Sequence, residues 1–425
     1  MAMLLDTANI IFWGVLTFSI LIVLHEGGHF GAAKLFGVKV HEFMLGLPGP
    51  AIRFATKNTT YGITMIPLGG YVRIAGMEPG PEDELLAAAL RIVASQDKTD
   101  PDALVAALGV DRARAAAMLA MLADWGAIEP ATDDLVSYVL HHDVAHHEDA
   151  EEMLAAARKR TYRGLTTTKR LAVLAAGVLV NLVTAIIIFT VVLSVWGYDV
   201  PSMTISEIGV GTPAEAVGLR SGDVITSING RQFDDWYGLI NYLSITPPDS
   251  SGTLVYERAG SSTRIDITFA KNPDTGGALL GITSGRIRHV SLSPVQAFAE
   301  SLQWTRDSFM LIMAFFNPET FKIVAQNARS VVGVSVEAAN VVKYGKAVGY
   351  AQFIALLSLS LGIMNILPIP PLDGGKIVVE LFERIAGRAL GRKLQIGLSL
   401  AGALMLFSLI GYLMYADVLR YFVNA

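Results

Sequence analysis

Four segments of this chain are apolar over lengths that can cross a lipid bilayer as helices. A helix needs about 20 residues to span the hydrocarbon core, and residues 10–36, 171–196, 350–372 and 394–422 meet this requirement. The chain of 425 residues is 52% hydrophobic and only 17% charged, which is unusual for a soluble globular protein. The sequence therefore predicts a polytopic α-helical membrane protein with about four transmembrane helices.

The first apolar segment is unusual because its purely apolar part ends at Leu24. To cross a bilayer, the helix must continue through His25 and beyond. A signal peptide is the alternative interpretation, but the chain begins without a basic region, and no small-residue cleavage site precedes His25. We expect this segment to be retained as a span.

Positively charged residues orient the predicted spans. Lys and Arg near the ends of spans remain on the cytoplasmic side, and they gather between the first two spans and between the last two, at Lys34, Lys39, Arg53, Lys57, Arg158, Lys159, Arg160, Arg163, Lys169, Arg170, Lys376, Arg384, Arg388, Arg392 and Lys393. Both connections are therefore predicted to be cytoplasmic. The N-terminus, residues 198–349 and the C-terminus then lie outside, and His25 lies past the midplane toward the cytoplasm.

Two histidines and a glutamate interrupt the first span as His25-Glu26-x-x-His29. Ionisable residues inside a span are costly and mark functional sites. The imidazoles at i and i+4 share one helix face, which suits two ligands of a tetrahedral Zn²⁺, and Glu26 is the candidate general base. The chain has no Cys, so any further metal ligand must be His, Asp or Glu.

A third ligand is predicted at the end of the third span. Three prolines in four positions, Pro368, Pro370 and Pro371, prevent a regular helix there. Non-helical backbone at membrane depth is tolerated only inside protein or beside a water-filled cavity. Asp373 follows directly and is the candidate ligand; a solvated Asp in a loop just past the membrane is the alternative.

These motifs together resemble the site-2 protease family of intramembrane zinc metalloproteases. The resemblance covers nearly the whole chain except residues 78–157, and the two metal motifs are its most specific part. It rests on His25 to His29, Asn365-x-x-Pro368-x-Pro370-x-Leu372-Asp373-Gly374, residues 175–181 ending in Asn181, Pro67-Leu68-Gly69-Gly70-Tyr71-Val72, and Glu42-Phe43-x-x-Gly46. The family's usual Ala-Gly-Pro is Ala-Gly-Val here, a departure at the entry of the second span.

The resemblance implies a residue-by-residue assignment of the site. Zn²⁺ on His25, His29 and Asp373 would lower the pKa of a bound water, and Glu26 would take its proton. Asn365 would hold the substrate or stabilise the oxyanion. The resemblance also implies substrate contacts at a membrane-associated β-loop with Gly69 and Gly70, and at Asn181.

Residues 198–290 contain short alternating runs punctuated by Gly, which predict a small α+β domain. The stretch from Pro213 to Ile225 resembles a PDZ domain, which binds extended peptides at an open strand edge. An inert spacer is the alternative. Only one copy fits, so a stacked pair of such domains is not expected. Residues 291–349 have apolar residues at helical spacing and are predicted to form amphipathic helices on the membrane surface.

An acidic segment interrupts the resemblance. Residues 78–152 hold 17 acidic and 4 basic residues, net −13, and residues 102–128 read as helix, Gly turn and helix, resembling a winged-helix module. We predict a separate cytoplasmic domain over residues 78–160. Its charge would repel phosphate, which argues against nucleic acid as a partner, and protein contact or self-association is the expected role.

Four of the eight histidines lie close together in this insert, at His141, His142, His146 and His147, beside Asp143, Glu148 and Asp149. They could bind a second metal or sense pH. A solvated surface cluster is the alternative that we favour.

The sequence predicts a zinc endopeptidase that cuts membrane-spanning segments of other proteins. The predicted parts are residues 8–77 (first span and β-loop), 78–160 (insert), 161–197 (second span), 198–290 (PDZ-like domain), 291–349 (surface helices) and 350–425 (last two spans). The family implies a bacterial inner-membrane location with the site toward the cytoplasm, and release of a membrane-bound anti-sigma factor or removal of remnant signal peptides as tasks. A catalytically inactive membrane PDZ scaffold is the alternative function.

Overall fold

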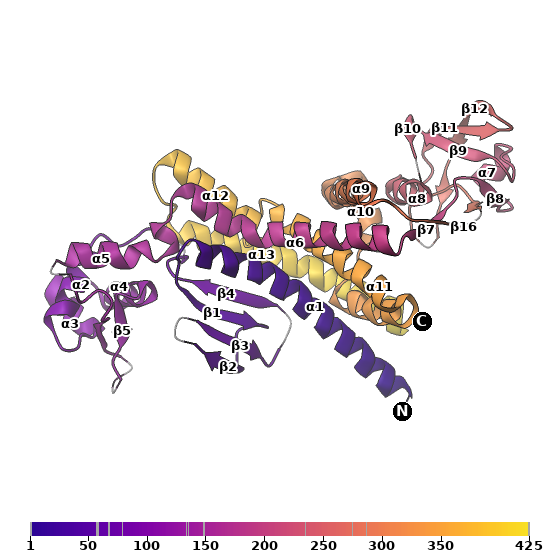
Figure 1. The fold of residues 1–425 in the computed structure, drawn as a ribbon. Helices are drawn as coiled ribbons and strands as arrows, with labels where there is room; N and C mark the ends of the chain where they lie inside the picture. The colour runs from indigo at the N-terminus through magenta and orange to yellow at the C-terminus, as the bar shows by residue number, and fades with distance from the viewer. Residues whose placement is uncertain are drawn as a thin grey trace. The chain divides into compact units, whose positions relative to one another are not determined.

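The structure, a computed structural model, describes residues 2–56, 59–66, 69–78, 80–132, 134, 136–147, 149–233, 235–273, 275–285 and 287–423. The chain divides into two compact units (Figure 1). The first unit holds Met1–Gly14, Leu182–Ile363 and Ser408–Ala425, and the second holds Val15–Asn181 and Met364–Phe407.

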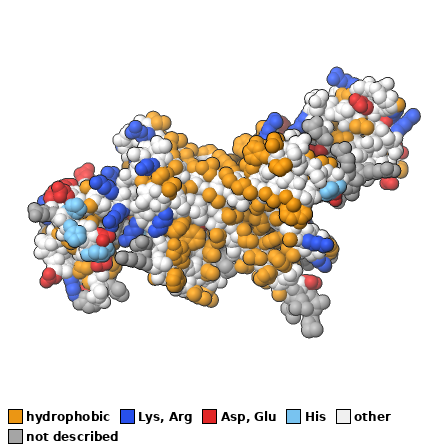
Figure 2. Space-filling view, in the orientation of Figure 1, with side chains coloured by type: hydrophobic (Ala, Val, Ile, Leu, Met, Phe, Trp, Pro, Cys, Tyr) orange, Lys and Arg blue, Asp and Glu red, His pale blue; other side chains and the backbone are white. Residues whose placement is uncertain are grey.

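Among the described residues, four helices are long and apolar enough to cross a membrane: α1 (Ala2–Leu35), α6 (Thr167–Val195), α11 (Val331–Ile366) and α13 (Arg392–Val418), which continues as a π-helix over Leu419–Val423. They confirm the four predicted segments. Large apolar side chains on these helices remain exposed, for example Ile187 on α6 and Phe407 on α13, and Figure 2 shows hydrophobic side chains gathered over the long helices. A helix that is apolar on its exposed face is suited to lipid.

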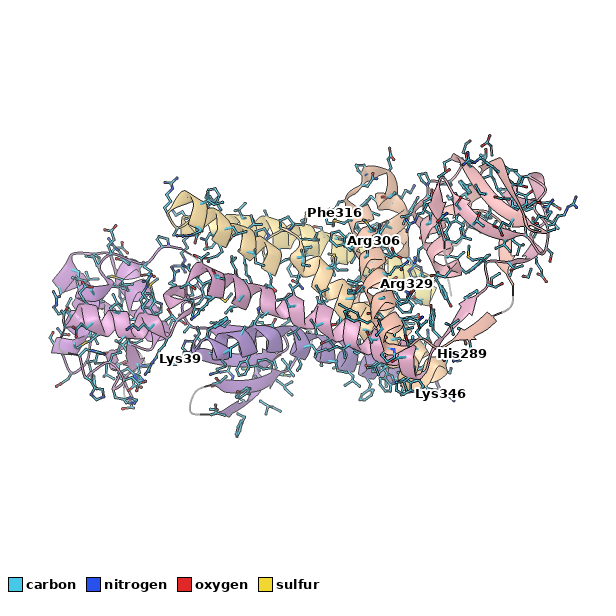
Figure 3. The ribbon with its side chains drawn as sticks, turned by 45° about the horizontal axis from the view of Figure 1, so that its top comes forward. Lys39, His289, Arg306, Phe316, Arg329 and Lys346 are labelled. Carbon is cyan, nitrogen blue, oxygen red and sulfur yellow. The ribbon has the colours of Figure 1, made fainter. Side chains whose placement is uncertain are left out.

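The third span differs from its predicted bounds at both ends. It was predicted to begin at Tyr350, but α11 begins at Val331, because neither Pro nor a Gly-Pro pair separates the amphipathic stretch from the apolar one. The break inside it is at Lys346, with φ 53° and ψ −154° (Figure 3). At the other end α11 stops at Ile366, since the residue before Pro368 disfavours the helical conformation.

The predicted surface-helix segment 291–349 is therefore divided. Its first part forms α9 (Pro294–Met313), a 3₁₀ turn (Ala314–Phe316) and α10 (Pro318–Asn327), and its last part belongs to α11. The α9–α10 pair is bent by 111° and would count as a fifth candidate span if both helices formed one. In the first unit, Phe189 of α6 packs with Leu359 of α11 in one apolar cluster, and Trp304 of α9 packs against it.

A four-stranded sheet follows α1 in the second unit. Its strands are β1 (Val40–Leu45), β2 (Ala51–Ala55), β3 (Thr60–Thr64) and β4 (Gly70–Ile74), in the order β2-β3-β1-β4. β1 runs parallel to β3 and antiparallel to β4. In the part of the chain that the structure describes, β4 is thus an edge strand with one unpaired side. Pro67 and Leu68 of that loop lie outside the described residues.

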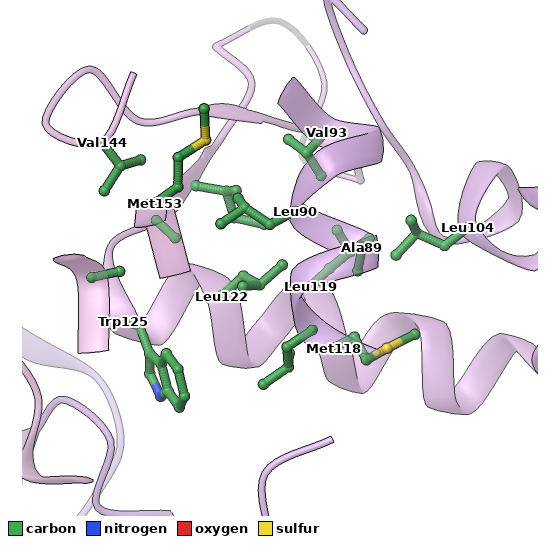
Figure 4. Packing of buried hydrophobic residues seen from close by; sticks show 14 of the residues in the cluster. Ala89, Leu90, Val93, Leu104, Met118, Leu119, Leu122, Trp125, Val144 and Met153 are labelled. Atoms are coloured by element: carbon green, nitrogen blue, oxygen red, sulfur yellow. The ribbon is translucent and has the colours of Figure 1, made fainter. Parts of the chain in front are cut away.

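The acidic insert forms a small helical module with its own core. It contains α2 (Leu86–Ser95), α3 (Pro101–Leu108), α4 (Arg112–Trp125), the hairpin of β5 (Ile128–Pro130) and β6 (Tyr138–Leu140), and α5 (Ala150–Lys159). Asp100 and Asp111 accept hydrogen bonds from backbone N–H groups at the starts of α3 and α4, so part of the negative charge caps helices. Figure 4 shows Leu90, Leu119 and Trp125 in the buried core.

The half-buried carboxylate of Asp124 connects the insert to the sheet. His41 Nε2 of β1 lies 2.8 Å from the backbone oxygen of Asp124 and 3.2 Å from its Oδ1. The Gly76 N–H, just after β4, donates to Asp124 Oδ2 over 2.6 Å. Burial alone would raise the pKa of Asp124, but the hydrogen bonds from His41 and Gly76 outweigh burial and hold this pKa below its ordinary value. The end of α4 is therefore fixed to the strands next to the predicted site.

We expect Asp124→Asn to destabilise this contact by about 1–3 kcal/mol, because an uncharged amide replaces a carboxylate that two donors satisfy. Since the folded pKa is depressed, the carboxylate stabilises the fold fully above its unfolded pKa; the difference between wild type and variant should begin to shrink as pH falls through about 4 and be lost only below the depressed folded pKa. Faster backbone hydrogen exchange over residues 39–45 measures the loss. Asp102→Asn, at an exposed ion pair with Arg112, is the control; equal exchange in wild type and D124N would contradict the contact's role.

The first unit contains the β-rich domain over residues 198–290. Its central sheet has the order β10-β9-β11-β12, and Ile228, Leu239 and Leu254 are fully buried in its core. Its elements are β7 (Tyr198–Pro201), β8 (Ile205–Ile208), α7 (Pro213–Ala216), β9 (Val224–Ile228), β10 (Arg231–Gln232), α8 (Trp236–Ile245), β11 (Ser251–Arg258), β12 (Ser261–Thr268), β13 (Ala270–Lys271), β14 (Ala278–Leu279), β15 (Ile282–Ser284) and β16 (Ile287–Val290).

Candidate metal centre

Two imidazoles and one carboxylate meet in the second unit. His25 and His29 lie one turn apart on α1, with ring centroids 4.9 Å apart and ring planes nearly perpendicular at 86°. Asp373 Oδ2 lies 3.1 Å from His25 Nε2 and 3.0 Å from His29 Nε2. Asp373, which is 344 positions from His29 along the chain, thus lies against the face of α1 that carries both histidines, as the sequence predicted.

Asp373 is the first residue of α12 (Asp373–Ala386), and non-helical backbone connects it to α11. This connection is packed closely. A Cβ on Gly374 would collide with the carbonyl oxygens of Ile366 and Leu367, and a Cβ on Gly402 of α13 would collide with the carbonyl of Pro370. The Lys376 ammonium lies 3.2 Å from Asp373 Oδ1. The carboxylate therefore faces the histidines with one oxygen and Lys376 with the other.

The second nitrogen of each imidazole is also engaged. His29 Nδ1–H donates to the backbone oxygen of Val173 on α6 over 2.8 Å, which leaves the Nε2 lone pair for a metal. His25 Nδ1 lies 3.2 Å from the side-chain amide of Asn181, which is fully buried. Turning the Asn181 amide by 180° exchanges its oxygen and its nitrogen. With the oxygen toward His25 Nδ1, the amide would accept a hydrogen bond from this nitrogen and orient His25 as the Val173 oxygen orients His29.

Close approach of α1 and α6 makes these contacts geometrically possible. A Cβ on Gly177 would lie 2.8 Å from His29 Cδ2 and 2.9 Å from His25 Cε1. A Cβ on Gly28 would lie 2.8 Å from the Cα of Gly177. Glycine at both positions is required because real Cβ atoms do not approach other heavy atoms so closely.

The donor set fits zinc. The ligand atoms of His25, His29 and Asp373 all lie within 4.8 Å of one another, and two imidazole nitrogens with one carboxylate oxygen are a typical ligand set of a catalytic zinc that keeps one position open. Zinc ligands at about 2.0–2.2 Å from the ion are themselves about 3.3 Å apart, so the observed separations of 3.0 and 3.1 Å need little change.

The other predicted site residues have different surroundings. Glu26 lies next to His25, and a Cβ on Gly70 of β4 would lie 3.6 Å from Glu26 Cγ. Gly69 has φ 102°, a conformation that favours glycine. Asn365 is buried in the last turn of α11. Asn181 was predicted to contact substrate; the structure places its amide against His25.

A cavity of about 490 Å³ lies between β4 and α12, the helix that begins at Asp373. Val72 and Arg73 of β4 line one part of it, and Pro370, Gly375 and Lys376 line another. Sequence reasoning missed Lys376, Val173 and Gly177. For Lys376 a local signal existed, since it stands three residues after Asp373 on the same helix.

The histidine-rich segment of the insert does not join this centre. His141, His142 and Asp143 have ligand atoms within 4.8 Å of one another, but His142 and Asp143 are exposed, and Asp143 is paired with Arg160 over 2.5 Å. Glu148 lies outside the described residues. A second metal at this segment stays a hypothesis.

Comparison with known proteins identifies the class. The model of Peptidase family M50 matches residues 13–409, so the chain belongs to this family of membrane zinc metalloproteases, the site-2 protease family. It is a zinc metalloprotease.

Two relatives show how far the similarity extends. The zinc metalloprotease RasP of Shouchella clausii is 26% identical over 423 residues, covering 95% of this chain and 97% of that protein. The regulator of sigma-W protease RasP of Bacillus subtilis is 26% identical over 424 residues, covering 96% and 98%. Among solved structures, the PDZ domain of an SdrC-like protein from Listeria monocytogenes is 23% identical and matches 20% of this chain and 87% of its own, with a TM-score of 0.19.

A small change at Gly177 should weaken zinc binding without removing a ligand. In Gly177→Ala the new methyl group would press on both imidazoles, and overpacking of this kind costs about 1–3 kcal/mol, or roughly a 5- to 150-fold loss in zinc affinity. Zinc titration against a competing chelator measures the change. Gly31→Ala, on α1 with open space around its Cβ, is the matched control; unchanged affinity in G177A would show that the helix contact does not set the site.

Proposed function

We propose that this zinc metalloprotease cleaves peptide bonds within membrane-spanning segments, with His25, His29 and Asp373 as the zinc ligands. The observation that carries this proposal is a metal-type donor set buried among apolar helices and close to a cavity beside an edge strand. Cleavage of soluble peptides does not require a site on a membrane-spanning helix. A substrate helix in the bilayer, by contrast, would lie at the same depth as this site.

The chain's own groups supply the remaining chemistry. Zinc bound at this site provides a Lewis acid and lowers the pKa of water. Glu26 accepts the proton of the attacking water and passes it to the leaving amide nitrogen. Val173 and Asn181 hold the imidazole rings in orientation, and Lys376 holds the second oxygen of Asp373. Asn365 is assigned to the substrate backbone or the oxyanion.

The substrate must be extended when it is cut, because the peptide bonds of a helix are already hydrogen-bonded and shielded. The open side of β4 offers backbone donors and acceptors to one further strand. Gly70 places the start of this strand beside Glu26. We assign the substrate strand to β4, with Gly69 and Gly70 leaving room for its backbone.

The positive-inside rule supports a plasma-membrane orientation with the insert and the site toward the cytoplasm and the β-rich domain outside. The B. subtilis relative is named as a regulator of sigma-W. By analogy, membrane-bound regulators with one spanning helix are the proposed substrate class, and remnant signal peptides are chemically equivalent. The insert, with its net −13 and its own core, is assigned to a protein partner or to self-association.

Glu26→Gln tests the mechanism. Loss of the base should reduce cleavage of a model transmembrane substrate at least a hundredfold while zinc remains bound, because none of the three ligands changes. The readouts are substrate cleavage in proteoliposomes and zinc content of the same sample. Asp6→Asn, an exposed acid-to-amide change on α1, is the control. Full activity in E26Q would refute the mechanism and would also leave the inactive-scaffold alternative without support.

The β-rich domain is proposed to act as a PDZ domain that limits substrate size. α8 and the chain from β14 to β15 line a small cavity of about 70 Å³, with Ile240, Leu243 and Gly281 among its residues. β15 is paired only with β8 in the described chain, which leaves the side toward this cavity for an extended peptide.

Removal of residues 198–286 should make substrates with bulky outer domains as readily cleaved as shortened ones. The ratio of the two cleavage rates is the readout, and cleavage of the shortened substrate shows that the truncated enzyme is folded. A ratio that stays at its wild-type value would contradict the size filter.

A further inference from the structure

A second cavity, of about 450 Å³, opens next to the one beside β4. It lies in the second unit, and five arginines line it: Arg158, Arg163, Arg170, Arg384 and Arg388. The acidic residues of its wall are three glutamates, Glu82, Glu380 and Glu383. The balance of charge in the cavity therefore depends on which guanidinium groups these glutamates neutralise.

Two of the glutamates are each paired with one arginine. Glu82 Oε1 accepts from Arg158 over 3.0 Å. Glu380 Oε1 lies 3.0 Å from Arg170 Nη1, and its other oxygen accepts from the Tyr162 hydroxyl over 3.3 Å. Burial raises the pKa of Glu380.

The third glutamate is engaged by neutral donors. Glu383 Oε1 accepts from the Gln395 amide over 2.7 Å and from the backbone N–H of Leu390 over 2.8 Å. These two bonds fix the chain that leads from α12 into α13. Glu383 forms no ion pair with an arginine in the part of the chain that the structure describes.

The remaining three guanidinium groups differ in how their charge is balanced. Arg163 Nη2 donates to the backbone oxygens of Glu78 and Gly80 over 2.7 and 2.6 Å, and Glu82 and Glu383 act on its charge electrostatically. Burial lowers the pKa of Arg163, which reflects the cost of that charge. Among the described residues, Arg384 and Arg388 have neither an ion pair nor a side-chain hydrogen bond.

The position of the cavity indicates the kind of anion. Thr167, at its wall, is the first residue of the spanning helix α6, so the cavity lies where apolar helix surface begins. Figure 2 shows Lys and Arg side chains gathered between the insert and the hydrophobic surface over the long helices. Phosphate groups of lipids lie at this level, and guanidinium forks match phosphate oxygens in pairs.

We propose that this arginine-lined cavity binds a phosphate-bearing ligand, through Arg163, Arg384 and Arg388. A phospholipid head group and a free phosphate ester share the recognised chemistry. The ligand would neutralise the charges of Arg384 and Arg388, which form no ion pair within the described chain. It would also bind to α12, the helix that carries Asp373 at its first residue, so occupancy should stabilise the segment that presents this carboxylate.

The test measures ligand-dependent stability of the full-length zinc-loaded protein. Thermal unfolding is followed in neutral detergent at low salt after addition of phosphatidylglycerol, phosphatidylcholine, glycerol 3-phosphate or inorganic phosphate. We expect phosphatidylglycerol, whose head group is net anionic, to raise Tm more than phosphatidylcholine, whose choline cation offsets the charge of its phosphate. In Arg384→Gln/Arg388→Gln the apparent affinity should fall on the order of tenfold to thirtyfold, because each basic group near a membrane surface contributes about one factor of five.

The matched control removes two arginines of the second unit that do not line the cavity. Arg91→Gln/Arg112→Gln changes the net charge equally, and both residues are exposed, so its response should equal that of wild type. Stabilisation by the two small phosphates to the same extent as by phosphatidylglycerol would identify the ligand as a free phosphate ester. No stabilisation by any phosphate compound, or an undiminished effect in R384Q/R388Q, would overturn the proposal.

Discussion

The convergence of two imidazole nitrogens on one carboxylate oxygen is the interaction on which the rest of the site depends. His25 and His29 come from one helix, and Asp373 comes from backbone near the other end of the chain. Such a group of polar atoms inside apolar surroundings is stable only when each member is satisfied. Val173, Asn181 and Lys376 provide the second contacts, so the site is held on every side by groups that do no chemistry themselves.

Small residues and prolines make this convergence possible. Glycines at positions 28 and 177 allow α1 and α6 to approach so closely that a carbonyl of α6 reaches His29. The prolines after Ile366 end α11 and free the chain to turn Asp373 back toward the histidines. The same turned segment lines the cavity beside β4, which connects the ligand geometry to the proposed position of the substrate strand.

The sequence predicted what depends on local pattern. Periodicity of 3.6 residues placed His25 and His29 on one face, and prolines predicted the break before Asp373; the structure brings these three residues together. The predicted start of α11 was wrong, because no local sequence signal separates its amphipathic part from its apolar part. His41–Asp124 and the contact of Asn181 with His25 join residues 83 and 156 positions apart, and a single sequence carries no signal for such pairs. The arginine cavity was missed for the same reason: five guanidinium groups from distant segments meet only in the folded chain.

X-ray absorption at the zinc edge of the purified protein tests the central claim most directly, because it counts imidazole ligands on the metal itself. The account predicts a first shell of nitrogen and oxygen at about 2.0–2.2 Å with outer-shell scattering from two imidazoles, and loss of one imidazole in His29→Ala. A spectrum with one imidazole or with three or more, or a spectrum unchanged in H29A, would contradict a metal centre built from His25, His29 and Asp373.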